Sequence, residues 1–124
     1  MRQAFAHQAR IELLGGGDER APGAAVTVAL CGQWEHEGAC EVPHRTDVAG
    51  ADDDLVVRVL FACDPADEGD VRARVDRALA GGALPVPAPR EAPPTRWRLL
   101  HSAPVPVPDA DSDVAARFVS APRP

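Results

Sequence analysis

The chain contains no lysine, no asparagine and no tyrosine, and its single isoleucine is Ile11. All of these residues have AT-rich codons, whereas alanine, arginine, proline, glycine, valine and aspartate are abundant. We therefore interpret the composition as that of a GC-rich, bacterial genome and give little weight to the proline count. The glycine run at residues 15–17 lacks the lysine and the helix of a phosphate-binding loop, which excludes that motif.

Acidic residues outnumber basic ones by 19 to 13, and long apolar runs are scarce. The formal net charge is −6, which opposes binding to a polyanion, so we expect no nucleic-acid partner. No segment approaches the roughly 18 consecutive apolar residues of a membrane span. The first ten residues lack the apolar stretch of a signal peptide. We therefore expect no membrane association and a cytoplasmic location.

Cysteine is limited to three residues, an odd number that cannot all pair within one chain. In a reducing compartment such thiols are free, catalytic or bound to metal. A disulfide between Cys31 and Cys40 is the alternative if the protein is exported.

The pattern of apolar residues predicts one α+β domain over residues 1–124, a length that suits a single core. Alternation with a period of two predicts strands, and an apolar stripe at helical spacing predicts helices. We expect a mostly antiparallel four-stranded sheet with one main helix and a short C-terminal helix, in the order β-β-β-α-β-α. The expected strands are 5–13, 24–31, 55–63 and 95–102, the helices 64–82 and 111–120, and a proline-rich connector 85–94 joins the last strand.

The most informative segment, residues 31–44, reads CGQWEHEGACEVPH and places four metal ligands in the pattern C-x4-H-x3-C-x3-H. Thiolate sulfur and neutral imidazole nitrogen are the donors that Zn²⁺ prefers. We therefore predict a zinc site in a loop spanning residues 31–54, with copper and iron as alternatives. Its ligands would be Cys31, His36, Cys40 and His44.

This spacing lacks the short C-x2-C knuckle of known zinc motifs, so the competing interpretation is that these are ordinary loop residues. Four protein ligands would make the site structural, whereas three ligands and a water would make it catalytic. Our leading hypothesis is a small metal-binding protein with a binding or assembly role. The alternatives are a metalloenzyme, a cysteine-dependent enzyme, and an accessory subunit that docks on a larger enzyme through the proline-rich connector and Trp34.

Three further residues are candidates for function. Cys63 lies where a strand meets a helix N-terminus, which can activate a thiol, but its position in the apolar alternation predicts burial and low reactivity. His7 and His101 fall on the inward faces of the first and last predicted strands. If those strands are neighbours, the two imidazoles would form a second polar site; otherwise each is satisfied by a local hydrogen bond.

Overall fold

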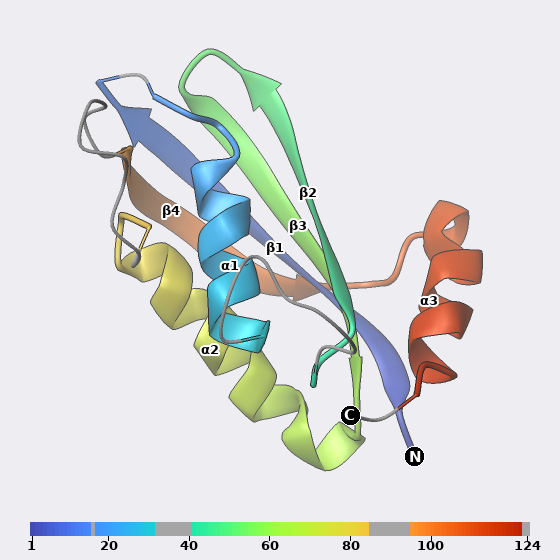
Figure 1. Cartoon of the computed structure of the whole chain (residues 1–124). Helices are drawn as coiled ribbons and strands as arrows, with labels where there is room; N and C mark the ends of the chain where they lie inside the picture. The colour runs from blue at the N-terminus through green and yellow to red at the C-terminus, as the bar shows by residue number, and fades with distance from the viewer. Residues whose placement is uncertain (16, 32–40, 85–94, 123–124) are drawn as a thin grey trace.

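Four antiparallel strands form one sheet in the order β2-β3-β1-β4 (Figure 1). The strands are β1 (Gln3–Leu14), β2 (His44–Ala51), β3 (Asp54–Cys63) and β4 (Arg96–Val105). The structure, a computed structural model, describes residues 1–15, 17–31, 41–84 and 95–122. The predicted connector 85–94 therefore lies outside the described residues.

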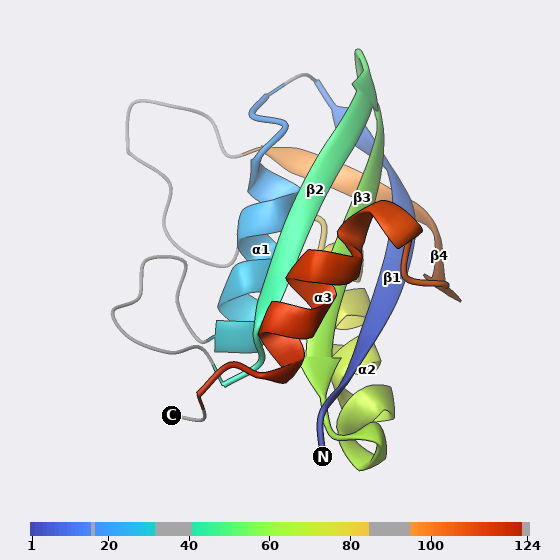
Figure 2. The same ribbon diagram turned by 90° about the vertical axis from the view of Figure 1, so that its right-hand side faces the viewer.

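Helices cover the sheet from both sides. The helices α1 (Ala21–Cys31) and α2 (Glu68–Ala80) pack together on one face, and α3 (Ser112–Val119) lies across the other (Figures 1 and 2). Short 3-10 turns, Pro65–Asp67 and Asp109–Asp111, lead into α2 and α3. The connectivity β-α-β-β-α-β with this strand order is the split βαβ, or ferredoxin-like, topology, to which α3 is appended. None of the described helices is long and apolar enough to cross a membrane.

The main core lies between the sheet and the pair α1 and α2. As the alternation predicted, one set of β3 side chains faces these helices and is at most 7% exposed. On the opposite face of β3, Leu60 and Ala62 are buried toward α3, Val56 is partly buried and Arg58 is exposed. The fold class and the predicted strands at β1, β3 and β4 are thus confirmed, as are the helices at α2 and α3. The inward set of β3 is Leu55, Val57, Val59, Phe61 and Cys63.

The segment predicted as a second strand, 24–31, is instead part of the helix α1. Its alternating valines suggested a strand, but its buried residues Ala25, Val26 and Leu30 recur at helical spacing. Pro22 suits a first helical turn because that turn needs no N–H from it. The local propensities of this segment for helix and for strand are balanced. Its packing against α2 and the sheet therefore determines that it forms a helix.

The second strand, β2, comes from the segment that we predicted to be a loop. Its sequence, HRTDVAGA, has too few apolar side chains to show a strand pattern, because β2 is an edge strand with one side exposed. A tight turn joins it to β3, with Asp52 at a φ of 56°. Gly50, at a φ of 136°, also requires glycine, since a Cβ there would collide with the carbonyl oxygen of Asp54.

A second glycine sets the distance between α1 and β2. A Cβ added to Gly23 would lie 3.3 Å from Cγ2 of Thr46 and 3.7 Å from Cγ2 of Val48. The helix backbone therefore rests directly on the side chains of the edge strand. This contact fixes how α1 runs along β2 toward the start of that strand.

Candidate functional site

Two of the four predicted metal ligands meet where α1 ends and β2 begins. Cys31 is the last residue of α1, and His44 is the first residue of β2. The Cys31 sulfur lies 3.6 Å from Nδ1 of His44. His44 faces α1 because it pairs with Phe61, which belongs to the buried face of β3. Helix direction and strand register thus bring together two residues that are thirteen positions apart in the sequence.

Further hydrogen bonds fix the orientation of the His44 imidazole. Its Nδ1 lies 2.9 Å from the carbonyl oxygen of Val42, so in this state Nδ1 carries the proton and donates it. Its Nε2 lies 3.2 Å from Oγ1 of Thr27, which is also within 3.3 Å of the carbonyl oxygen of Gly23. Sequence reasoning did not identify Thr27, because only the α1 helix places it beside His44.

The His44 imidazole has two tautomers, of which only the first keeps the hydrogen bond to Val42. In one, Nδ1–H donates to Val42 and the Thr27 hydroxyl donates to Nε2. In the other, the Thr27 hydroxyl donates to Gly23 and accepts from Nε2–H, which leaves the Nδ1 lone pair facing the sulfur of Cys31. A metal-binding imidazole usually donates its other ring N–H to a nearby acceptor, and the second tautomer provides that acceptor.

The same imidazole lines a cavity of about 740 Å³ along the outer edge of β2. The α1 helix forms one wall, through Gly23 and Thr27, and Phe118 of α3 contributes to another. His44 and Thr46 project from the strand between these walls. The candidate site is therefore accessible to solvent and is not sealed within the core.

The remaining predicted ligands, His36 and Cys40, lie outside the described residues, so the four-ligand site stays a prediction. Cys31 is disulfide-bonded, whereas Cys63 is free. In this oxidised state Cys31 has no thiolate to offer a metal. Among residues 1–15, 17–31, 41–84 and 95–122, no three histidine, cysteine, aspartate or glutamate side chains gather as a metal site.

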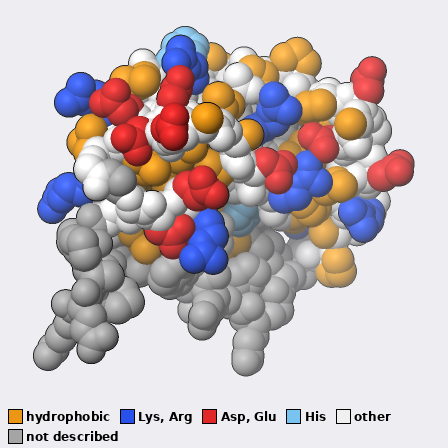
Figure 3. Space-filling view, turned by 90° about the horizontal axis from the view of Figure 1, so that it is seen from above, with side chains coloured by type: hydrophobic (Ala, Val, Ile, Leu, Met, Phe, Trp, Pro, Cys, Tyr) orange, Lys and Arg blue, Asp and Glu red, His pale blue; other side chains and the backbone are white. Residues whose placement is uncertain are grey.

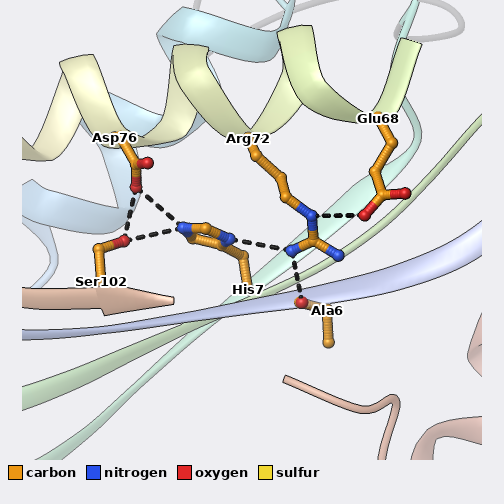
Figure 4. Close-up of polar contacts among 6 residues, drawn as sticks. All are labelled: Ala6, His7, Glu68, Arg72, Asp76 and Ser102. Atoms are coloured by element: carbon orange, nitrogen blue, oxygen red, sulfur yellow. Dashed lines mark hydrogen bonds and ion pairs between the residues drawn. The ribbon is translucent and has the colours of Figure 1, made fainter. Parts of the chain in front are cut away.

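A second polar cluster surrounds His7, which is only 3% exposed (Figure 4). Its Nε2 lies 2.8 Å from Oδ1 of Asp76 and 2.8 Å from Oγ of Ser102, which itself donates to Asp76. On the other side of the ring, Nη1 of Arg72 lies 2.9 Å from Nδ1. Arg72 also donates to the carbonyl oxygen of Ala6, at 2.7 Å. This cluster connects β1 to both α2 and β4.

The His7 cluster contains serine, histidine and aspartate, but its geometry is not that of a nucleophilic triad. Arginine has donors only, so Nδ1 of His7 must accept, and the ring proton lies on Nε2. Both Ser102 and Asp76 contact that protonated nitrogen, whereas a triad places them on opposite nitrogens. We therefore assign the cluster a structural role, as the local-hydrogen-bond interpretation of His7 predicted.

The expected meeting of His7 and His101 is wrong. An irregularity in the pairing of β1 with β4 matches Ile11 with Leu99 but Arg10 with His101, so Leu100 is an extra residue. In the part of β4 beyond this bulge, odd-numbered residues point to the outer face of the sheet and even-numbered residues point to the face that α1 and α2 cover. His101 is consequently exposed on the opposite face from His7, and the next residue, Ser102, takes the inward position.

The residues that α2 contributes to the His7 cluster recur at every fourth position, a helical spacing that can be seen in the sequence. Glu68, Arg72 and Asp76 are four residues apart and share one face of α2. Glu68 and Arg72 form an ion pair, with Nε and Oε2 2.8 Å apart. What the sequence did not show is that this charged stripe lies against β1 and is only partly exposed to solvent.

Cys63 is 7% exposed and packs in the main core, as the strand pattern predicted. Burial, reinforced by the negative charges of Asp67 and Glu68, raises the pKa of its thiol to about 11. The thiol is therefore protonated at neutral pH. This environment argues against a nucleophilic role.

The raised pKa of Cys63 predicts a dependence of stability on alkaline pH. The unfolded thiol ionises near pH 9 and the folded thiol near pH 11, so the unfolded state loses its proton first as the pH rises. We expect the free energy of unfolding to fall by about 2 kcal/mol more in the wild type than in Cys63→Ala between these values. Urea unfolding at pH 8, 9, 10 and 11 measures this, and parallel curves for the two proteins would refute it.

Charges of both signs are mixed over the surface. Figure 3 shows aspartate and glutamate side chains interspersed with arginine and apolar side chains on the described part of the face seen from above. Several of these charges pair locally, as in the ion pairs of Arg10 with Asp54 and of Arg20 with Asp18. Such exposed pairs contribute little to stability.

Comparison with known proteins adds no independent information on the site. No protein-family model, no curated protein and no solved structure matches this chain. The function must therefore be argued from the contacts around Cys31 and His44.

Proposed function

We propose that the protein binds zinc in its reduced state, through Cys31 and His44 together with His36 and Cys40. The observation that carries this proposal is the 3.6 Å separation of the Cys31 sulfur and Nδ1 of His44. Tetrahedral zinc holds sulfur at about 2.3 Å and nitrogen at about 2.0–2.1 Å, which places two such ligands about 3.6 Å apart. The two atoms thus already have the spacing of neighbouring zinc ligands.

The surroundings of His44 support this assignment. In the tautomer that leaves Nδ1 free for a metal, Nε2–H donates to Thr27, whose hydroxyl donates in turn to Gly23. Zinc would displace the Nδ1 proton and the hydrogen bond to Val42, so its binding should release a proton and weaken at low pH.

The role that fits such a site is structural. Zinc bound by four protein ligands keeps no open position for a substrate. Here it would join the end of α1 to the start of β2 and stabilise the connection between them. We therefore favour a small zinc-binding protein with a binding or assembly function, and the protonated thiol of Cys63 gives no support to the cysteine-enzyme alternative.

Oxidation should abolish zinc binding, because the disulfide at Cys31 removes a thiolate ligand. We expect protein reduced with a phosphine, loaded with zinc and desalted without oxygen to retain close to one zinc ion per chain. The oxidised protein should retain almost none. Elemental analysis of both samples, with cobalt substitution to report tetrahedral thiolate ligation, measures this.

The matched control is Cys63→Ser, which alters a buried thiol outside the site and should keep its zinc when reduced. Cys31→Ser should lose it under the same conditions. Reduced wild-type protein without stoichiometric zinc would overturn the proposal, and so would equal zinc content in Cys31→Ser.

A further inference from the structure

Among the described residues, no strand pairs with the outer edge of β2. In the described part of the sheet β3 is the only neighbour of β2. Ala62 donates its N–H to the carbonyl oxygen of Pro43, 3.0 Å away, which marks these opposed residues as a hydrogen-bonded pair. Along an antiparallel ladder, pairs that are hydrogen-bonded alternate with pairs that are not. Counting from Pro43, every second residue of β2 bonds to β3. The residues between them, Thr46 and Val48, therefore direct their N–H and C=O groups away from β3. Those groups point toward the cavity that runs along the strand.

This edge lacks two of the devices with which natural sheets protect their edges. Prolines and bulges discourage strand pairing, and β4, the other edge, has both: the bulge at Leu100 and the proline Pro104. The β2 strand has neither. The cavity of about 740 Å³ along this edge gives an added strand space.

We propose that β2 pairs antiparallel with β2 of a second copy of this chain, about a two-fold axis at Thr46. The two sheets would then form one continuous eight-stranded sheet. A two-fold axis makes the interface self-complementary, so every contact between the two strands occurs twice.

Charge selects this register among the neighbouring ones. With the axis at Thr46, Arg45 lies opposite Asp47 of the partner subunit, and the symmetric contact repeats this pair. An axis one residue earlier places Arg45 opposite Arg45 of the partner subunit, and an axis one residue later places two aspartates opposite each other. Opposite charges across strands stabilise pairing, whereas like charges directly opposed destabilise it.

An unsatisfied hydroxyl points to the same axis. Oγ1 of Thr46 is the one buried side-chain oxygen or nitrogen in the described residues that lacks a hydrogen-bond partner. Such an atom costs free energy until it is paired. On the proposed axis Thr46 lies opposite Thr46 of the partner subunit, and a rotation about χ1 would turn the two buried hydroxyls toward each other to hydrogen-bond across the paired strands.

The test measures self-association of the oxidised, metal-free chain by sedimentation equilibrium, which separates it from the zinc proposal. We expect a monomer–dimer equilibrium in the wild type. Asp47→Arg should weaken it by about tenfold or more, because two attractive contacts become repulsive. Arg45→Glu should do the same. Mixing the two variants should restore dimers as heterodimers, since every facing pair is then of opposite charge.

Arg45 also forms an ion pair with Asp111, and Arg45→Glu removes it. If that variant does not fold, Thr46→Pro provides a second test of the dimer. The Thr46 N–H points away from β3, so proline there should leave the β2–β3 ladder intact, which circular dichroism checks. It should weaken the dimer by about tenfold to a hundredfold. A monomeric wild type at about 100 µM would overturn the proposal. So would a dimer that both Asp47→Arg and Thr46→Pro leave unchanged.

Discussion

Replacing His44 with alanine is expected to lower the zinc affinity of the reduced protein by more than about a hundredfold. In the proposed site the imidazole would supply a nitrogen ligand beside the Cys31 sulfur, and losing even a residue that merely orients a ligand costs roughly 10–100-fold. Competition with a chromogenic chelator, under a phosphine reductant, measures the affinity.

Two further variants separate ligation from a general effect of substitution. Thr27→Val keeps the shape of the side chain but removes the hydroxyl that orients His44, so it should weaken zinc binding by only about tenfold. His101→Ala removes an exposed histidine on the opposite face of the sheet and should have no effect. Equal affinities in all three variants would contradict the assignment of His44 as a ligand.

Replacing Arg72 with methionine is expected to lower the free energy of unfolding by about 3 kcal/mol. The substitution leaves the carbonyl oxygen of Ala6 and Nδ1 of buried His7 without their donor, and each unsatisfied group costs about 1–3 kcal/mol. It also removes the guanidinium from the rings of Phe5 and Phe61, whose centroids lie 5.7 and 5.3 Å away.

The control for this prediction is Arg58→Met. Arg58 is exposed and its guanidinium donates to Oε1 of Gln8, so its loss should cost less than about 1 kcal/mol. Urea unfolding at neutral pH, with both variants in the same oxidation state, gives the two free energies. Arg72→Lys should fall between, because its ammonium keeps the charge but cannot reach all of the acceptors at once. Similar losses for Arg72→Met and Arg58→Met would show that the cluster is not structural.

The parts of the fold that the sequence predicted are those with a strong, one-sided pattern. Every second residue of β3 is apolar and buried because that face packs under two helices, and α2 has clear charges at its ends and an apolar stripe. The sequence failed at α1 and β2 for opposite reasons. The valines of α1 prefer strands although its burial is helical, and β2 is so exposed that little of its pattern is apolar.

The meeting of Cys31 and His44 was predictable because the proposed ligands are close together in the sequence. Chemistry and spacing alone identified Cys31 and His44 as partners, and the structure brings these two together. Thr27 was not predictable, because its role depends on α1 being a helix that runs back along β2. The outward position of His101 depends on a single bulge, which no periodicity in β4 reveals.

The α1 helix touches β2 near both of its ends, through Gly23 against Thr46 and Val48 and through Cys31 against His44. A helix of eleven residues is a rod about 16 Å long that does not bend easily, so a shift at one end displaces the other. Metal at Cys31 and a second chain beside Thr46 would therefore act on the same rigid body. Thermodynamic linkage then requires reciprocity: if zinc changes the affinity of two copies for each other, pairing must change the affinity for zinc by the same factor.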